Sequence, residues 1–136
     1  MSDKLNAAIE LYDSVVAEIS RSENAVEIAL RPAYVHQSTG QPGVDDGIGS
    51  VQNVVISLEE GSITGDVGGL PRDIFDGQFV VGHQAFPNVI ALPCDIVGSV
   101  RLTVFLSPDN RKVVIIGKRI TIRFEGQASY DEEFRR

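Results

Sequence analysis

The first twenty residues carry apolar side chains at a helical spacing. Between Asp3 and about Arg21 these residues recur at steps of four and three, with charged residues between them. Such spacing is typical of one stripe along an amphipathic α-helix. The stripe consists of Leu5, Ile9, Tyr12, Val16 and Ile19. We therefore predict an N-terminal helix, with its cap, over residues 1–24, and expect its stripe to form one side of the core.

After Asn24 the apolar positions alternate with polar ones, which indicates half-buried strands. The alternation is clearest over Val26–Leu30 and Ser99–Leu106, and the second of these runs into a turn sequence at 107–110. Turn residues recur often enough to predict about seven or eight short, largely antiparallel strands over residues 25–126. The predicted fold class is α+β, mostly β: one domain over residues 1–136, in which the helix packs on a sandwich or a partly open barrel and an acidic tail covers 127–136.

Two residues inside the predicted strands mark irregularities. Pro32 follows the Val26–Leu30 alternation and lacks a backbone donor, so that strand lies at a sheet edge or bulges there. Gly117 and Lys118 interrupt a later apolar run. They form either a two-residue hairpin or a bulge in one long strand.

Length and composition narrow the class of protein. The 136 residues suit one ordinary domain, and the single cysteine cannot form an internal disulfide. The acidic residues near the N-terminus do not fit a secretory signal. Apolar runs such as Val113–Ile116 are far shorter than a membrane span. We expect a cytoplasmic protein with no membrane contact.

The charge is unevenly distributed along the chain. The net charge is −7, but residues 1–96 carry −10 and residues 97–124 carry +5. The overall sign disfavours a general nucleic-acid binder and docking on anionic lipid. We expect a molecule with one acidic and one basic region.

The basic residues of two late strands fall at outward positions. If the alternating apolar residues point inward, the opposite face carries Arg101, Phe105, Arg119 and Arg123. This face is either solvated, or a contact surface for an acidic protein partner or the acidic part of another copy. Nucleic acid is the least favoured ligand, because Phe105 is the one stacking aromatic. We predict a homodimer that uses this face.

Two long connections, residues 37–50 and 68–77, are candidate binding loops. The alternative interpretation is irregular surface loops, with glycines supplying positive φ angles and Asp73 and Asp76 acting as capping and turn residues. If Asp73 and Asp76 share a helical turn, they could instead act as a carboxylate pair. The candidate ligand-binding residues in and beside these loops are His36, Asp45, Asp46, Asp73, Asp76 and His83.

No motif in the sequence identifies a catalysed reaction. The two histidines have no ligand spacing, so we predict no metal and no cofactor. Cys94 is expected to be a lone buried thiol, and no catalytic residue is assigned. The sequence favours a non-enzymatic interaction module that acts through its surface. A small-molecule or metal-ion binding β domain with a site at the two loops is the alternative, and a small hydrolytic enzyme is the third possibility.

Overall fold

Nearly all of the described chain is strand. The computed structural model describes the backbone of residues 6–38 and 47–134 and the side chains of residues 7–38 and 47–126. In this part the only helical element is a three-residue 3₁₀ helix. The elements are β1 (Asn6–Glu10), η1 (Leu11–Asp13), β2 (Val15–Arg21), β3 (Ala25–Ser38), β4 (Gly47–Glu59), β5 (Ser62–Thr64), β6 (Arg72–Val81), β7 (Gln84–Pro87), β8 (Val89–Leu92), β9 (Asp95–Leu106) and β10 (Arg111–Phe134).

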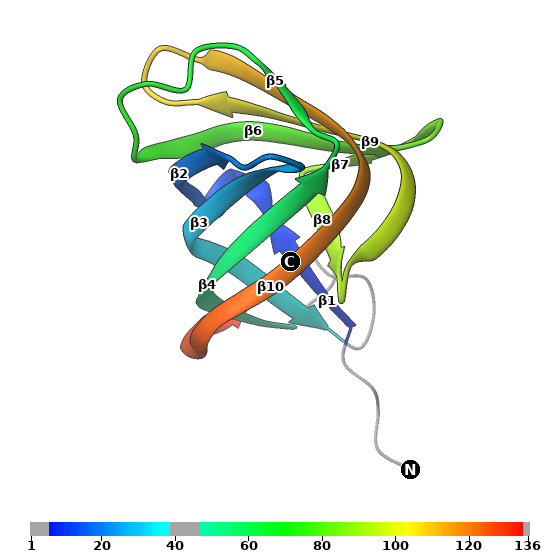
Figure 1. The fold of residues 1–136 in the computed structure, drawn as a ribbon. Helices are drawn as coiled ribbons and strands as arrows, with labels where there is room; N and C mark the ends of the chain where they lie inside the picture. The colour runs from blue at the N-terminus through cyan, green and yellow to red at the C-terminus, as the bar shows by residue number, and fades with distance from the viewer. Residues whose placement is uncertain (1–5, 39–46, 135–136) are drawn as a thin grey trace.

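The strands form one antiparallel sheet that closes on itself (Figure 1). Neighbouring strands follow the order β2, β6, β9, β10, β4, β3, and β2 pairs in addition with β3. Beyond this ring, β1 pairs with β3 and with β8, while β5 pairs with β10 and β7 with β6. The structure thus has the mostly antiparallel β architecture that the alternation indicated, but as a single closed sheet and not as a sandwich of two.

The predicted N-terminal helix is wrong. Residues 6–21 form β1, η1 and β2, and the two strands pair with successive parts of β3. Leu11 lies outside the predicted stripe yet is fully buried, whereas Tyr12 lies on the stripe and is 57% exposed. The β-branched residues Ile9, Val16 and Ile19 suit a strand, and pairing with β3 outweighs the local preference for helix.

A β-bulge explains why the N-terminal spacing looks helical. Val16 lies opposite Leu30 and Ile19 opposite Ile28, so three steps along β2 match two steps along β3. Both side chains therefore face the core despite an odd spacing, which a regular strand does not allow. The 3₁₀ turn before β2 interrupts the alternation a second time.

Pro32 and Gly117 both lie at shifts in strand register. The register of β3 against β4 shifts between Leu30 and Ala33, around Pro32, although β3 lies inside the sheet with partners on both sides. Between Gly117 and Arg119, two steps along β10 match three steps along β9, so the extra residue lies on β9 and β10 continues as one long strand. Of the alternatives left open by the sequence, the structure has a bulge at Pro32 and one long strand at Gly117, with the bulge on the neighbouring strand.

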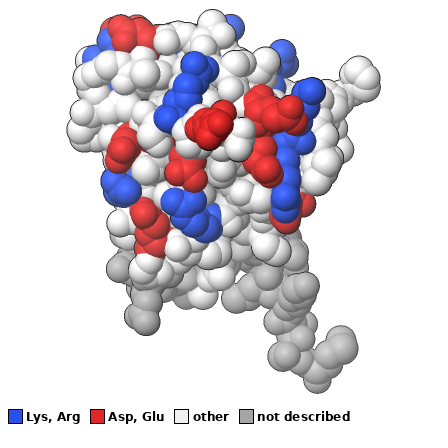
Figure 2. All heavy atoms as spheres, in the orientation of Figure 1, with Lys and Arg blue, Asp and Glu red and all other residues white. Residues whose placement is uncertain are grey.

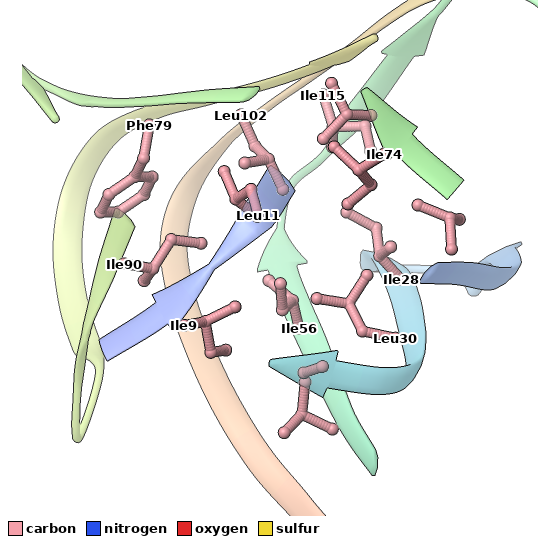
Figure 3. Close-up of a cluster of buried hydrophobic side chains, with 14 of the residues drawn as sticks. Ile9, Leu11, Ile28, Leu30, Ile56, Ile74, Phe79, Ile90, Leu102 and Ile115 are labelled. Carbon is pink, nitrogen blue, oxygen red and sulfur yellow. The ribbon is translucent and has the colours of Figure 1, made fainter. Parts of the chain in front are cut away.

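One hydrophobic core fills the closed sheet. The alternating residues of β9 that were predicted to point inward, Val100, Leu102, Val104 and Leu106, are all buried. Figure 3 shows labelled side chains from several strands pointing toward one another in this interior. The largest fully buried side chains are Ile9, Leu11, Ile28, Leu30, Ile56, Leu58, Ile74, Ile90, Leu102, Leu106, Ile115 and Ile120. The interior of this small closed sheet is therefore packed with side chains.

The described ends of the predicted 37–50 loop belong to strands. Gln37 and Ser38 complete β3, and residues 47–50 begin β4. Gly47 and Gly49 do not supply positive φ angles, which was the role predicted for the loop glycines. They make room instead, because a Cβ at Gly49 would overlap the Tyr34 hydroxyl and one at Gly47 would overlap the Gln37 carbonyl.

Candidate functional site

Two adjoining hollows lie where η1 and the start of β2 meet β6. The first has a volume of about 350 Å³, and its lining includes Tyr12, Asp13 and Phe75. The second has a volume of about 500 Å³, and its lining includes Val15, Pro71 and Pro108. Asp73 and Ser107 line both. We call the two hollows together the Tyr12–Phe75 groove; the remaining lining residues are Ser14, Gly69, Arg72 and Ile74.

Tyr12 reaches the groove because its turn is held from both sides. The Leu11 amide donates to the Asn88 backbone carbonyl at 2.8 Å, and the Tyr12 amide donates to the Asn88 side-chain oxygen at 2.6 Å. The Ser14 amide closes the turn on the Leu11 carbonyl at 3.0 Å. Leu11 is thereby fixed in the core, and its neighbour Tyr12 must face solvent.

Phe75 reaches the groove because β6 bulges beneath it. Ile74 pairs with Leu106 and Asp76 with Phe105, which leaves Phe75 as the extra residue on its strand. A bulge of this kind redirects a side chain. Ile74 is buried, while Phe75 is 55% exposed.

The far wall of the groove is held by two arginines. Arg72 Nη1 lies 3.1 Å from Asp109 Oδ1 and donates to the Ser107 carbonyl at 3.3 Å. Arg111 donates to the Gly68 carbonyl at 2.7 Å and lies 3.3 Å from Asp109 Oδ2. Partial burial opposes ionisation of Asp109, but the charges of Arg111 and Arg72 outweigh it and hold its pKa below the ordinary value. The 66–72 segment is thus tied to the β9–β10 turn.

Ser14 has a structural role at the base of the groove. Its side-chain oxygen donates to the Glu10 carbonyl at 2.8 Å and accepts the Tyr34 amide at 2.9 Å. The residue is buried. Its hydroxyl therefore links β1 and β3 across the start of β2 and does not point a proton at the groove.

The structure separates the ligand-binding residues predicted from the sequence. Asp73 lies in the groove, and Asp76 is exposed on β6, where its carboxylate accepts the Gly77 amide at 2.8 Å. They share a bulged strand, so they do not lie together on a helical turn, which was the condition for a carboxylate pair. His36 is fully buried in β3, where it lies opposite Ala8 of β1, whereas His83 is exposed in the β6–β7 turn. Asp45 and Asp46 lie outside the described residues.

The predicted basic face is largely neutralised within the chain. Arg119 lies 2.9 Å from Asp95 and 3.4 Å from Glu59, and its hydrogen bond holds the pKa of Asp95 below the ordinary value. Arg123 lies 2.9 Å from Glu27. The charges that are separate in sequence are mixed because β10 lies between β4 and β9. On the face shown in Figure 2, basic and acidic side chains lie interspersed. Of the predicted set, Arg101 is exposed and Phe105 is half-buried.

Tyr12 and Phe75 were missed by the sequence analysis. Tyr12 was placed in a buried helical stripe, and Phe75 in an irregular connection. Their exposure depends on a turn held by Asn88 and on a bulge against β9, both set by residues distant in sequence. An acidic residue lies near each aromatic in the sequence, Asp13 next to Tyr12 and Asp73 close to Phe75. Of these two, only Asp73 is among the ligand-binding residues predicted from the sequence.

Comparison with protein-family models, curated proteins and solved structures gives no match for this chain. Within the described residues, no three or more His, Cys, Asp or Glu side chains gather where they could hold a metal ion. In the same part of the chain, no helix has the length and apolar character needed to cross a membrane.

Proposed function

We propose that this chain is a non-enzymatic interaction module that binds a protein partner at the Tyr12–Phe75 groove. The observation that carries the proposal is that two aromatic side chains, each more than half exposed, line the same hollow. Aromatic residues are enriched at the energetic centres of protein interfaces. A partner that covered both rings would remove apolar surface from water.

The rigidity of the groove supports the same role. Asn88 holds the turn that carries Tyr12, and Asp109 links the two arginines that hold the opposite wall. Binding to a surface that is already ordered costs less conformational entropy. The contact residues are thus held in place by hydrogen bonds and ion pairs before a partner arrives.

A small-molecule ligand is the second candidate for the groove. The volumes of the two hollows, about 350 and 500 Å³, fall within the range of known ligand pockets, about 300–1,000 Å³. Hydrolysis is less well supported, because the Ser14 hydroxyl is engaged with the Glu10 carbonyl. Because the interior of the closed sheet is filled with side chains, a ligand of either kind would bind at the surface.

Site-specific photocrosslinking tests the interaction role. A benzophenone amino acid at position 75 is expected to give a discrete protein adduct in the cells that express the chain. Phe124 is a matched control, because it is also an aromatic, 49% exposed, and lies outside the groove lining. An adduct from position 75 that is lost when Tyr12→Ser is added supports the proposal. The same adducts from both positions, or none from 75, would remove it.

The homodimer stays a prediction. Two exposed apolar side chains on β9 and β10, Val97 and Ile116, support a contact between copies on that side of the sheet, and Ile116 lies opposite Arg101. The driving force expected from Arg119 and Arg123 is weaker than the sequence indicated, because both are paired within the chain. We expect sedimentation to show a dimer at about 100 μM and Ile116→Asp to give a monomer. A wild-type monomer at that concentration would contradict it.

A further inference from the structure

We infer that the Tyr12–Phe75 groove recognises a peptide segment of the partner through a lysine or arginine side chain. This inference rests on the proposed function and adds the chemistry of the recognised group. The cationic group would lie in the first hollow, against the aromatic rings and the Asp73 carboxylate. The residues flanking it would lie along the second hollow.

The aromatic rings supply the first part of the argument. Tyr12 and Phe75 line a hollow of about 350 Å³ and are 57% and 55% exposed. The face of an aromatic ring attracts an ammonium or guanidinium group, and the attraction grows as water is excluded. A hollow with two such rings favours a long cationic side chain whose aliphatic stem also packs on apolar surface.

Asp73 supplies the second part. Its carboxylate is exposed and makes no ion pair or side-chain hydrogen bond with any other residue that the structure describes. The adjacent guanidinium of Arg72 is engaged with Asp109 and the Ser107 carbonyl. The negative charge of Asp73 is therefore left for a ligand, and the net charge of −7 attracts a cationic segment over longer distances.

The second hollow explains why a peptide fits better than a free cation. It continues from Asp73 and Ser107 to Val15, Pro71 and Pro108, which present apolar surface. An isolated ammonium ion would leave this surface in water. An extended segment with an apolar residue beside the basic one would cover it.

The chemistry of the lining disfavours other ligands. An anion would meet the Asp73 carboxylate without a free cation beside it, since Arg72 is already paired. A metal ion prefers several oxygen ligands, and among the residues that the structure describes no three His, Cys, Asp or Glu side chains gather where they could hold one. A sugar could stack on the rings, and the experiment below separates it from a peptide.

Nuclear magnetic resonance titration of the ¹⁵N-labelled protein tests the inference. The probes are blocked pentapeptides, acetyl-Ala-Leu-Xaa-Leu-Ala-amide, with lysine or arginine at Xaa. The uncharged isosteres norleucine and citrulline serve as matched controls. We expect the lysine or arginine peptide to shift the amide signals of Tyr12, Asp73 and Phe75, and the uncharged peptides to bind about tenfold more weakly. Equal binding of charged and uncharged peptides, or no shift in the groove with about 10 mM peptide, would overturn the inference.

Two variants separate the charge of Asp73 from the fold. Asp73→Asn should weaken the binding of the charged peptide about fivefold to tenfold and leave the binding of the uncharged peptide unchanged. Asp76→Asn is the control on the same strand, because Asp76 is exposed but does not line the groove. Equal effects of the two variants would contradict the assignment. If the partner crosslinked at position 75 binds the Asp73→Asn protein as tightly as wild type, the interaction role stands and the cationic chemistry is wrong.

Two further probes identify other ligands. Spermidine carries amino groups without a peptide backbone, and a chitin trisaccharide offers hydroxyls and sugar faces without charge. We expect spermidine to bind more weakly than the lysine peptide and the trisaccharide not to shift the groove signals. Spermidine binding as tight as the peptide, or groove shifts with the trisaccharide alone, would replace the peptide with that ligand and overturn the inference.

Discussion

Leu11→Ala is expected to lower the free energy of unfolding by about 2–5 kcal/mol, because it removes a fully buried side chain and leaves a cavity. The site cannot collapse easily. Leu11 packs closely on Gly77, where an added Cβ would lie 2.7 Å from Leu11 Cδ1 and 2.9 Å from Leu11 Cβ. The turn around Leu11 is held at Asn88 and cannot move inward without losing those hydrogen bonds.

Tyr12→Ala is the matched control for this prediction. Because Tyr12 is 57% exposed, its replacement by alanine should lower the free energy of unfolding by about 1 kcal/mol or less. If residues 1–24 formed a helix with Tyr12 on its apolar stripe, Tyr12→Ala would lower the free energy of unfolding more than Leu11→Ala. Urea denaturation of both, followed by circular dichroism, gives the comparison. A larger loss for Tyr12→Ala than for Leu11→Ala would contradict the strand and turn arrangement.

The second large effect is a loss of stability at alkaline pH caused by Cys94. Burial, followed by the negative charge of Asp95, raises the pKa of this thiol from 9.0 to about 11. Between these values the folded chain keeps a proton that the unfolded chain loses, so stability is full below pH 9 and falls as the pH rises toward 11. The contribution amounts to about 2–3 kcal/mol at 1.36 kcal/mol per pKa unit.

Comparison with Cys94→Ala isolates this effect from other groups that titrate at high pH. We expect the wild type to lose about 2 kcal/mol more than the variant between pH 8 and pH 10.5. At pH 8 the folded wild type should also react slowly with iodoacetamide, because only the thiolate attacks. Parallel pH profiles for the two proteins, or fast alkylation of the folded chain, would contradict the burial of this thiol.

The alternation of apolar residues was enough to predict the strands that follow a regular period. In β9, Val100, Leu102, Val104 and Leu106 are separated by single residues, and all four are buried as expected. No bulge interrupts this stretch in its pairing with β10. Each of these side chains faces the core because successive side chains of a regular strand point to opposite faces of the sheet.

The N-terminal segment could not be predicted in the same way because its phase is set by a distant strand. Val16 and Ile19 face the core together only because β2 bulges against Leu30 and Ile28. A helix gives the same spacing without a bulge, and the sequence does not distinguish the two. The partner strand β3 is what decides between them.

The candidate site was predictable only in part for a related reason. Asp73 was selected because it lies in a long connection. Phe75 is exposed by a bulge against β9, and Tyr12 by a turn held at Asn88, so neither exposure can be read from neighbouring residues. Likewise, the pairing of Arg119 with Asp95 and Glu59 depends on the order of the strands.

The central claim is that Tyr12 and Phe75 together form the binding surface. Its most direct test uses the partner protein that is captured by crosslinking from position 75. Calorimetry measures the affinity of this partner for the wild-type chain and for the double variant Tyr12→Ser/Phe75→Ser. We predict that the double variant stays folded and loses at least about 2 kcal/mol of binding free energy, or about thirtyfold in Kd, while Phe124→Ser binds like the wild type. An unchanged Kd for the folded double variant would contradict the claim.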